Sequence, residues 1–192
     1  MTRLNAKEAL AVVHGARAAH DVVVTTMTPA RDWMTMPQTP LDLVLVPSAM
    51  SHATSMGLGL ALAQPERRVI VCNGDGSMVM NLGSLVSIAE ARAANLTVLV
   101  FDNGTYEVTG SQRVPGAGSV NFVQLADGAG FRATFQFFDI ETWRRGARNA
   151  LFAPGPTFIW LRVAPLVGLP GPKSPGPAGA RATAFMGAIR AE

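Results

Sequence analysis

The segment RRVIVCN (67–73) runs directly into GDGSMVMN (74–81). The first segment is apolar and rich in β-branched residues, which predicts a buried strand. The second segment places the carboxylate of Asp75 between Gly74 and Gly76, where that strand ends. Burying a carboxylate costs free energy unless a positive charge meets it. This stretch therefore predicts a positively charged ligand at the end of the strand.

Strands and helices alternate on both sides of this segment. We expect helices over about 6–19, 52–63, 77–93, 121–129 and 139–152, and strands over about 21–26, 41–46, 67–73, 96–103, 131–138 and 156–163. Apolar strands joined by helices favour a mainly parallel sheet covered on both faces. The predicted fold class is a three-layer α/β/α domain, Rossmann-like, over residues 1–164. Residues 165–192 are predicted to form a Pro/Gly-rich arm with a short C-terminal helix, and residues 104–120 a long loop.

Composition excludes several classes of function. The net charge is +3 and there is no Lys/Arg run, so nucleic-acid binding is not expected. Cys72 is the only cysteine, so the chain has no internal disulfide. Lys7 and Glu8 interrupt any signal-like segment, and no apolar stretch is long enough to span a membrane. We expect a cytoplasmic protein that does not bind membranes.

Three predicted strands end in polar or glycine-rich residues. Thr26 and Thr28 lie at the first end, the glycines around Asp75 at the third, and Asn103 at the fourth. Ligands of parallel sheets bind beyond the carboxyl ends of the strands. The helix after Gly76 would offer free N–H groups to a phosphate, and oxygens of Asp75 and Asn103 suit Mg²⁺. The residues therefore predict a diphosphate bridged to the protein by Mg²⁺.

At this point the sequence resembles the thiamine diphosphate-dependent enzymes. Their cofactor-binding signature is GDG, then a helix and a strand, then Asn, which matches residues 74–76 and Asn103. The resemblance covers about 21–163 and is closest to phosphonopyruvate and sulfopyruvate decarboxylases, on SAMSHATSMGLGLALAQPERRVIVCNGDGS (48–77) and NGTYEVTGSQ (103–112). Two positions depart from the pattern. Asp102 stands where a first Asn is common, and Met27 where related chains have Gly. The implied domain is the diphosphate-binding one.

The resemblance implies a role for each matching residue. Asp75 and Asn103 would bind Mg²⁺ through their side chains, and Thr105 through its backbone carbonyl. Met50 would support the bent cofactor, and the carbonyl of Ser48 would accept a hydrogen bond from its aminopyrimidine. The other implied cofactor-binding residues are Thr26, Thr28, Ala49, Gly74, Gly76, Ser77, Tyr106, Glu107 and Val108. The candidate catalytic residues are His52, Glu107 and Gln112.

The family also needs a glutamate beside the pyrimidine ring, which a separate pyrimidine-binding domain supplies. This chain resembles only the diphosphate-binding half. The resemblance therefore implies a partner of the α type, in a hetero-oligomer with at least two of each chain. The implied reaction is non-oxidative decarboxylation of a small anionic 2-oxo acid, similar to sulfopyruvate or phosphonopyruvate, to an aldehyde and CO₂.

Three alternatives stay open. The chain could belong to an acetolactate-type carboligating enzyme, which captures the aldehyde instead of releasing it. It could also be a non-catalytic subunit that binds thiamine diphosphate and regulates its partner. A Rossmann-type nucleotide-binding module would need a glycine loop after the first strand, and DVVVTTMTPARD (21–32) contains no glycine.

Overall fold

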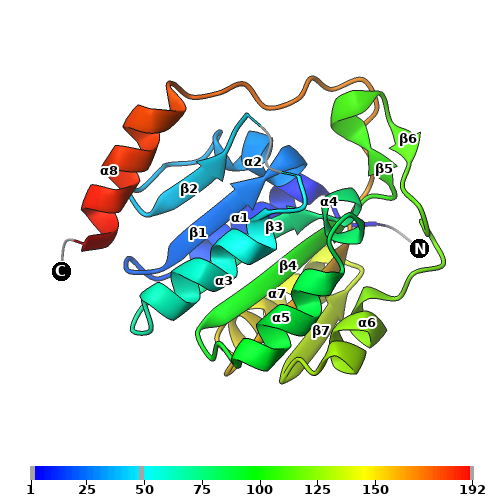
Figure 1. The fold of residues 1–192 in the computed structure, drawn as a ribbon. Coiled ribbons are helices and arrows are strands. Elements are labelled where there is room, and N and C mark those ends of the chain that lie inside the picture. The colour runs from blue at the N-terminus through cyan, green and yellow to red at the C-terminus, as the bar shows by residue number, and fades with distance from the viewer. Residues whose placement is uncertain (1–2, 48–49, 191–192) are drawn as a thin grey trace.

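Six parallel strands form the central sheet of the protein, in the order β2-β1-β3-β4-β8-β7 (Figure 1). The structure is a computed structural model and describes residues 3–47 and 50–190. The strands of the sheet are β1 (Val22–Thr26), β2 (Asp42–Leu45), β3 (Val69–Gly74), β4 (Leu96–Asp102), β7 (Ala133–Phe137) and β8 (Thr157–Arg162). A separate antiparallel pair joins β5 (Thr105–Tyr106) to β6 (Gln112–Arg113).

Helices cover both faces of this sheet. They are α1 (Ala6–Ala16), α2 (Met27–Trp33), α3 (Ala53–Ala63), α4 (Asp75–Val79), α5 (Gly83–Ala91), α6 (Phe122–Ala129), α7 (Ile140–Leu151) and α8 (Ala178–Arg190), with a 3₁₀ turn, η1, at Glu107–Thr109. Helices α1, α2 and α7 contribute to one hydrophobic cluster, and α3, α5, α6 and α8 to the other. None of the described helices is long and apolar enough to cross a membrane.

The two clusters are separated by the sheet because neighbouring side chains of a strand point to opposite faces. Ile70 packs with Leu99 and Trp143 in the first cluster. The next residue, Val71, packs with Phe158 in the second. All five of these side chains are fully buried. The predicted three-layer α/β/α fold is confirmed.

The helix expected over 77–93 is wrong in two respects. Helix α4 begins at Asp75, so the carboxylate lies in its first turn, and the helix ends at Val79. A second helix, α5, begins at Gly83. Between them Asn81 turns toward α3 and donates from its side-chain amide to the carbonyl of Ser51, at 2.8 Å. Asn81 thus lies in the break between the two helices, where its side chain links them to the segment before α3.

Other boundaries differ by a few residues or by an added element. Helix α1 ends at Ala16 instead of residue 19, because Arg17 is already extended. The predicted loop 104–120 contains β5, η1 and β6. Helix α2 has no counterpart among the predictions; it begins at Met27, whose φ of 56° is left-handed and follows β1 directly.

Residues 165–177 contain no helix or strand and carry the chain from β8 across to β2, at the opposite side of the sheet (Figure 1). Helix α8 then packs on the second cluster through Phe185 and Ile189. Arg181 donates to the carbonyl of Val44 at 2.7 Å and to that of Val46. These hydrogen bonds satisfy carbonyl groups along the outer edge of β2, which has no neighbouring strand.

Candidate functional site

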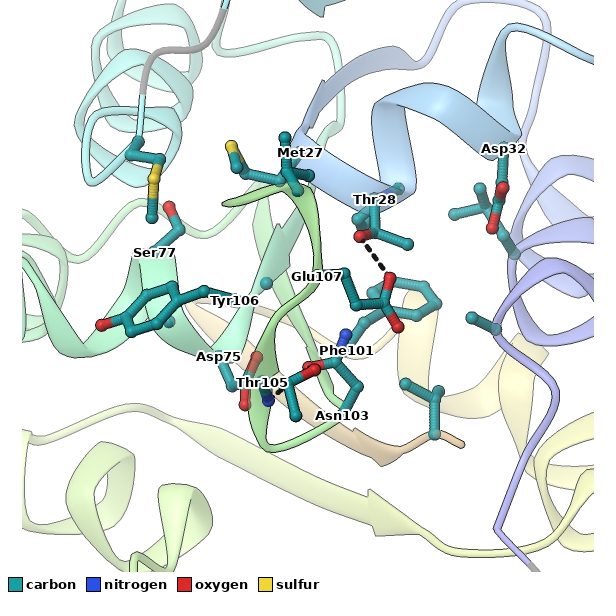
Figure 2. A pocket seen from close by; sticks show the side chains of 18 residues that line it. Met27, Thr28, Asp32, Asp75, Ser77, Phe101, Asn103, Thr105, Tyr106 and Glu107 are labelled. Carbon is teal, nitrogen blue, oxygen red and sulfur yellow. Dashed lines mark hydrogen bonds between the residues drawn. The ribbon is translucent and has the colours of Figure 1, made fainter. Parts of the chain in front are cut away.

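The carboxyl ends of β1, β3 and β4 meet at one edge of the sheet and form a pocket (Figure 2). Strands β3 and β4 pair in register, so that Gly74 lies opposite Phe101. Eleven of the predicted site residues line the pocket: Thr28, Met50, Gly74, Asp75, Gly76, Ser77, Asn103, Thr105, Tyr106, Glu107 and Val108. The parallel sheet therefore collects residues that lie far apart in the sequence.

Asp75 is the most perturbed acid of the pocket. Its residue is only 3% exposed, and one carboxylate oxygen accepts from the backbone N–H of Gly104 at 2.8 Å. Burial, followed by the nearby carboxylate of Asp102, raises the pKa of Asp75 to about 7. Asp102 is itself held by Trp160, whose indole N–H donates to it at 3.0 Å. Two carboxylates side by side in a buried site favour a cation between or beside them.

Asn103 and Thr105 face the same part of the pocket as Asp75 (Figure 2). The side-chain oxygen of Asn103 accepts from the backbone N–H of Thr105 at 2.8 Å, which fixes the orientation of the amide. Gly104 between them has a φ of 77° and makes this tight loop possible. The loop therefore presents oxygen atoms of the kinds that Mg²⁺ prefers.

Gly76 leaves room that no other residue would leave. A Cβ atom at this position would lie 2.3 Å from Cε1 of Tyr106, so the tyrosine ring packs directly on the glycine. Ser77 follows it in α4, and its hydroxyl accepts from the backbone N–H of Ser51 at 2.9 Å. This cradle, at the start of a helix, suits the close approach of a diphosphate to backbone N–H groups.

Glu107 is a second buried acid of the pocket. Its carboxylate accepts from the hydroxyl of Thr28 at 2.8 Å (Figure 2) and from the backbone N–H of Leu166 at 2.6 Å. The guanidinium of Arg31 lies 4.0 Å away. Glu107 thereby joins the loop after β4 to helix α2 and to the arm that follows β8.

Some predicted site residues lie elsewhere. His52 and Gln112 are exposed and do not line the pocket; Nδ1 of His52 lies 2.7 Å from the carbonyl oxygen of Met50. Thr26 is fully buried at the end of β1, and its hydroxyl has no hydrogen-bond partner among the described residues. The positions of Ser48 and Ala49 lie outside the described residues.

The structure adds contacts that the sequence did not reveal. Asp102 is a charged neighbour of Asp75, although as a sequence position it was only a departure from a pattern. Met27 and Asp32 line the pocket from helix α2, and the backbone N–H of Leu166 in the arm donates to the pocket residue Glu107. The sequence offered one signal for the contacts of α2, namely Met27 at a position where related chains have Gly. Met27 keeps the left-handed backbone that glycine favours.

Comparison with known proteins decides the family. The model of the thiamine pyrophosphate enzyme C-terminal TPP binding domain matches residues 21–161. The chain belongs to this family. The prediction of the family is therefore confirmed, as is thiamine diphosphate as the cofactor that the domain binds.

Individual enzymes with similar sequences support the same family. Phosphonopyruvate decarboxylase of Streptomyces viridochromogenes is 36% identical over 188 residues, which are 96% of this chain and 46% of that protein. Sulfopyruvate decarboxylase subunit beta of Methanothermobacter thermautotrophicus is 35% identical over 158 residues, 82% of this chain and 81% of that subunit. The chain thus spans less than half of the first relative but most of the second.

A solved structure supports the fold. The thiamine diphosphate-dependent 4-hydroxybenzoylformate decarboxylase of Rhodococcus jostii RHA1 superposes with a TM-score of 0.73 at 24% identity. The match covers 85% of this chain and 33% of that one. The same three-layer architecture therefore occurs within a much longer thiamine diphosphate-dependent enzyme.

The pocket fits the cofactor of the family on its own chemistry. Asp75 is buried beside a second carboxylate, which suits a divalent cation. The glycine cradle against Tyr106 suits a phosphate-rich ligand. Among the described residues no three His, Cys, Asp or Glu side chains gather as a metal site. A site made of one carboxylate, one amide, a carbonyl and phosphate oxygens does not need such a cluster.

Proposed function

We propose that this chain is the subunit that binds diphosphate and Mg²⁺ in a two-subunit, thiamine diphosphate-dependent decarboxylase of small anionic 2-oxo acids. The observation that carries the proposal is the buried carboxylate of Asp75, placed against the loop of Asn103 and Thr105. The similarity to most of a sulfopyruvate decarboxylase beta subunit supports the arrangement in two chains. The expected products are an aldehyde and CO₂.

Each binding residue has a defined task in this proposal. Asp75 and Asn103 hold Mg²⁺ through side-chain oxygens, and Thr105 through its carbonyl. Gly76 and Ser77 hold the diphosphate at the start of α4. When bound, thiamine diphosphate supplies the carbon nucleophile and the electron sink that decarboxylation needs.

The walls of the pocket would orient the reacting groups. Met50 lines the pocket and would support the cofactor from below. Glu107 lies in the same wall with its carboxylate held by Thr28, so it would face substrate or cofactor in one fixed orientation. His52 and Gln112 are exposed on this chain, so a catalytic role for either would depend on the partner covering them.

The partner would be a pyrimidine-binding subunit that supplies the glutamate, in an assembly with at least two of each chain. Exposed apolar side chains on α3, after α4 and on α5 support a docking face. Met56 on α3 is 46% exposed, Met80 after α4 is 55% exposed, and Val86 on α5 is 60% exposed. Asn81 bridges these elements by its hydrogen bond to Ser51, which brings the segments together. Large apolar side chains gathered on one face mark interaction surfaces.

Calorimetric titration of thiamine diphosphate tests the binding part of this proposal. We expect thiamine diphosphate to bind in the presence of Mg²⁺ and not in EDTA. If the chain alone gives no heat of binding, the titration is repeated with the partner subunit present. Release of CO₂ and aldehyde from sulfopyruvate and phosphonopyruvate tests the reaction in the reconstituted pair. Capture of the aldehyde by a second 2-oxo acid would identify carboligation instead. Metal-dependent binding without turnover in the pair would identify a non-catalytic subunit.

A further inference from the structure

A second cavity lies against the loop that carries the proposed metal ligands. Its volume is about 380 Å³, within the range of small-molecule sites. Asn103 and Thr105 line both this cavity and the cofactor pocket. The diphosphate cradle of Gly76 and Ser77 lines only the pocket. The loop is therefore a wall between two separate spaces.

Three arginines line this second cavity: Arg3, Arg113 and Arg162. They come from the N-terminal segment, from β6 and from the end of β8. Among the described residues, Asp102 contributes the only carboxylate of the lining, and it already accepts from the indole of Trp160. The cavity therefore carries an excess of positive charge.

None of these three guanidinium groups forms an ion pair with a carboxylate of the described residues. Arg113 donates to the carbonyl of Ala117 at 2.6 Å, and Arg3 makes a long contact of 3.5 Å with the carbonyl of Asn103. Other arginines of the chain do lie within 4.0 Å of acids, namely Arg17, Arg31, Arg68 and Arg144. The cavity thus gathers cations whose donors are not used by any acid within residues 3–47 and 50–190.

Arg162 is oriented by aromatic rings. Its guanidinium carbon lies 5.5 Å from the ring centre of Phe138 and 5.8 Å from that of Trp160. Cation–π contacts of this kind do not use the N–H groups as hydrogen-bond donors, which leaves them able to bind an anionic acceptor. The rings therefore hold Arg162 ready for an anion without neutralising it.

We propose that this cavity binds a tetrahedral oxyanion, as inorganic phosphate or as the phosphonate or sulfonate end of a free 2-oxo acid. Guanidinium groups pair best with phosphate-like oxygens in bidentate geometry. Three arginines that converge from three segments match an anion with at least three oxygens better than a carboxylate with two. The site is distinct from the diphosphate cradle. Binding of inorganic phosphate is independent of the proposed function, whereas the choice of a 2-oxo acid as the second ligand rests on it.

Titration calorimetry of inorganic phosphate into the full chain, at low ionic strength, tests this site. We expect saturable binding that Arg113→Gln and Arg162→Gln each weaken by about tenfold, the loss expected for one charge-assisted contact. The matched control is Arg132→Gln, an exposed arginine beside β7 that lies outside the cavity lining. Near-ultraviolet circular dichroism confirms that each variant keeps its tertiary structure.

Parallel titrations with sulfopyruvate distinguish the two sources of the anion. Tighter, arginine-dependent binding of phosphate assigns the site to the inorganic ion, and tighter binding of sulfopyruvate assigns it to the free 2-oxo acid. Absence of saturable binding by either anion would overturn the proposal. So would binding that the cavity variants leave unchanged, since it would lie elsewhere, or an equal loss in Arg132→Gln, since it would reflect net charge alone.

Discussion

Replacing Asp75 by asparagine should separate stability from cofactor binding. Asparagine has nearly the same shape, and its side-chain oxygen can still accept from the N–H of Gly104, as the carboxylate does at 2.8 Å. Its amide can also donate to Asp102, the neighbouring acid that helps to raise the pKa of Asp75. The substitution therefore removes a buried charge without leaving a cavity.

The magnitude follows from the pKa. The ordinary carboxyl pKa of 3.8 rises to about 7 in the fold, which is equivalent to roughly 4 kcal/mol. Because the folded protein holds this proton more tightly than the unfolded chain, the contribution of Asp75 to stability is most favourable below pH 4 and declines as the pH rises to about 7. The variant lacks this decline. Without metal we expect it to exceed the wild type by up to about 4 kcal/mol at pH 8, and the difference to shrink by roughly 2–3 kcal/mol at pH 5.

Urea unfolding in EDTA at pH 5 and pH 8 measures this difference, with fluorescence of the buried Trp33 and Trp143 as the signal. Asp127→Asn is the control, since Asp127 is an exposed acid that accepts from Thr134 outside the pocket. Calorimetry on the same Asp75 variant should show that Mg²⁺-dependent binding of thiamine diphosphate is lost. A variant less stable than wild type at pH 8, or one with unchanged cofactor affinity, would refute the reasoning.

Three further predictions concern single contacts. Gly76→Ala should lower the free energy of unfolding in urea by about 1–3 kcal/mol, because the new Cβ would lie 2.3 Å from the ring of Tyr106. Adding Tyr106→Ala should recover part of this loss. If the losses of the two single variants simply add in the double variant, the contact is contradicted. Thr28→Val should lower the free energy of unfolding by about 1–2 kcal/mol at pH 8, because it removes a hydrogen-bond donor to Glu107. Thr28→Ser keeps the hydroxyl and should remain near wild type. Equal losses in both variants would show that the hydroxyl is not responsible. Burial raises the pKa of the Cys72 thiol, so a disulfide reagent should react with it only after unfolding, and fast reaction with the native protein would be inconsistent with its position.

The sequence was sufficient for the order of the elements because the core strands are almost purely apolar and differ in period from the helices. The sequence was insufficient to predict element boundaries that depend on a single side chain or on an uncommon backbone conformation. The break between α4 and α5 contains Asn81, which hydrogen-bonds to Ser51, and no periodic pattern encodes this contact. Helix α2 was missed for a similar reason: it begins at Met27 in a left-handed conformation that is uncommon for such a residue.

In the candidate site, too, some residues could be predicted from the sequence and others could not. A short motif with fixed spacing predicted Asp75 and Asn103, and the structure brings both to one pocket. The charge of Asp102 acts on Asp75 through space, so its effect depends on the pairing of β3 with β4. The hydrogen bond from Leu166 to Glu107 joins residues 59 positions apart. Contacts of this kind depend on the assembled sheet, and local sequence does not specify them.

This last contact bears on how the C-terminal segment relates to the site. Leu166 holds the carboxylate of Glu107, and Gly171 packs so closely on Val108 that a Cβ would lie 2.6 Å from its side chain. Beyond the arm, Arg181 anchors α8 to the edge strand β2. The segment therefore crosses the carboxyl edge of the sheet from β8 to β2 and is attached at both ends and at the pocket (Figure 1). Because Glu107 and Val108 of the pocket both contact the arm, the arm supports the site from behind as well as linking β8 to the last helix.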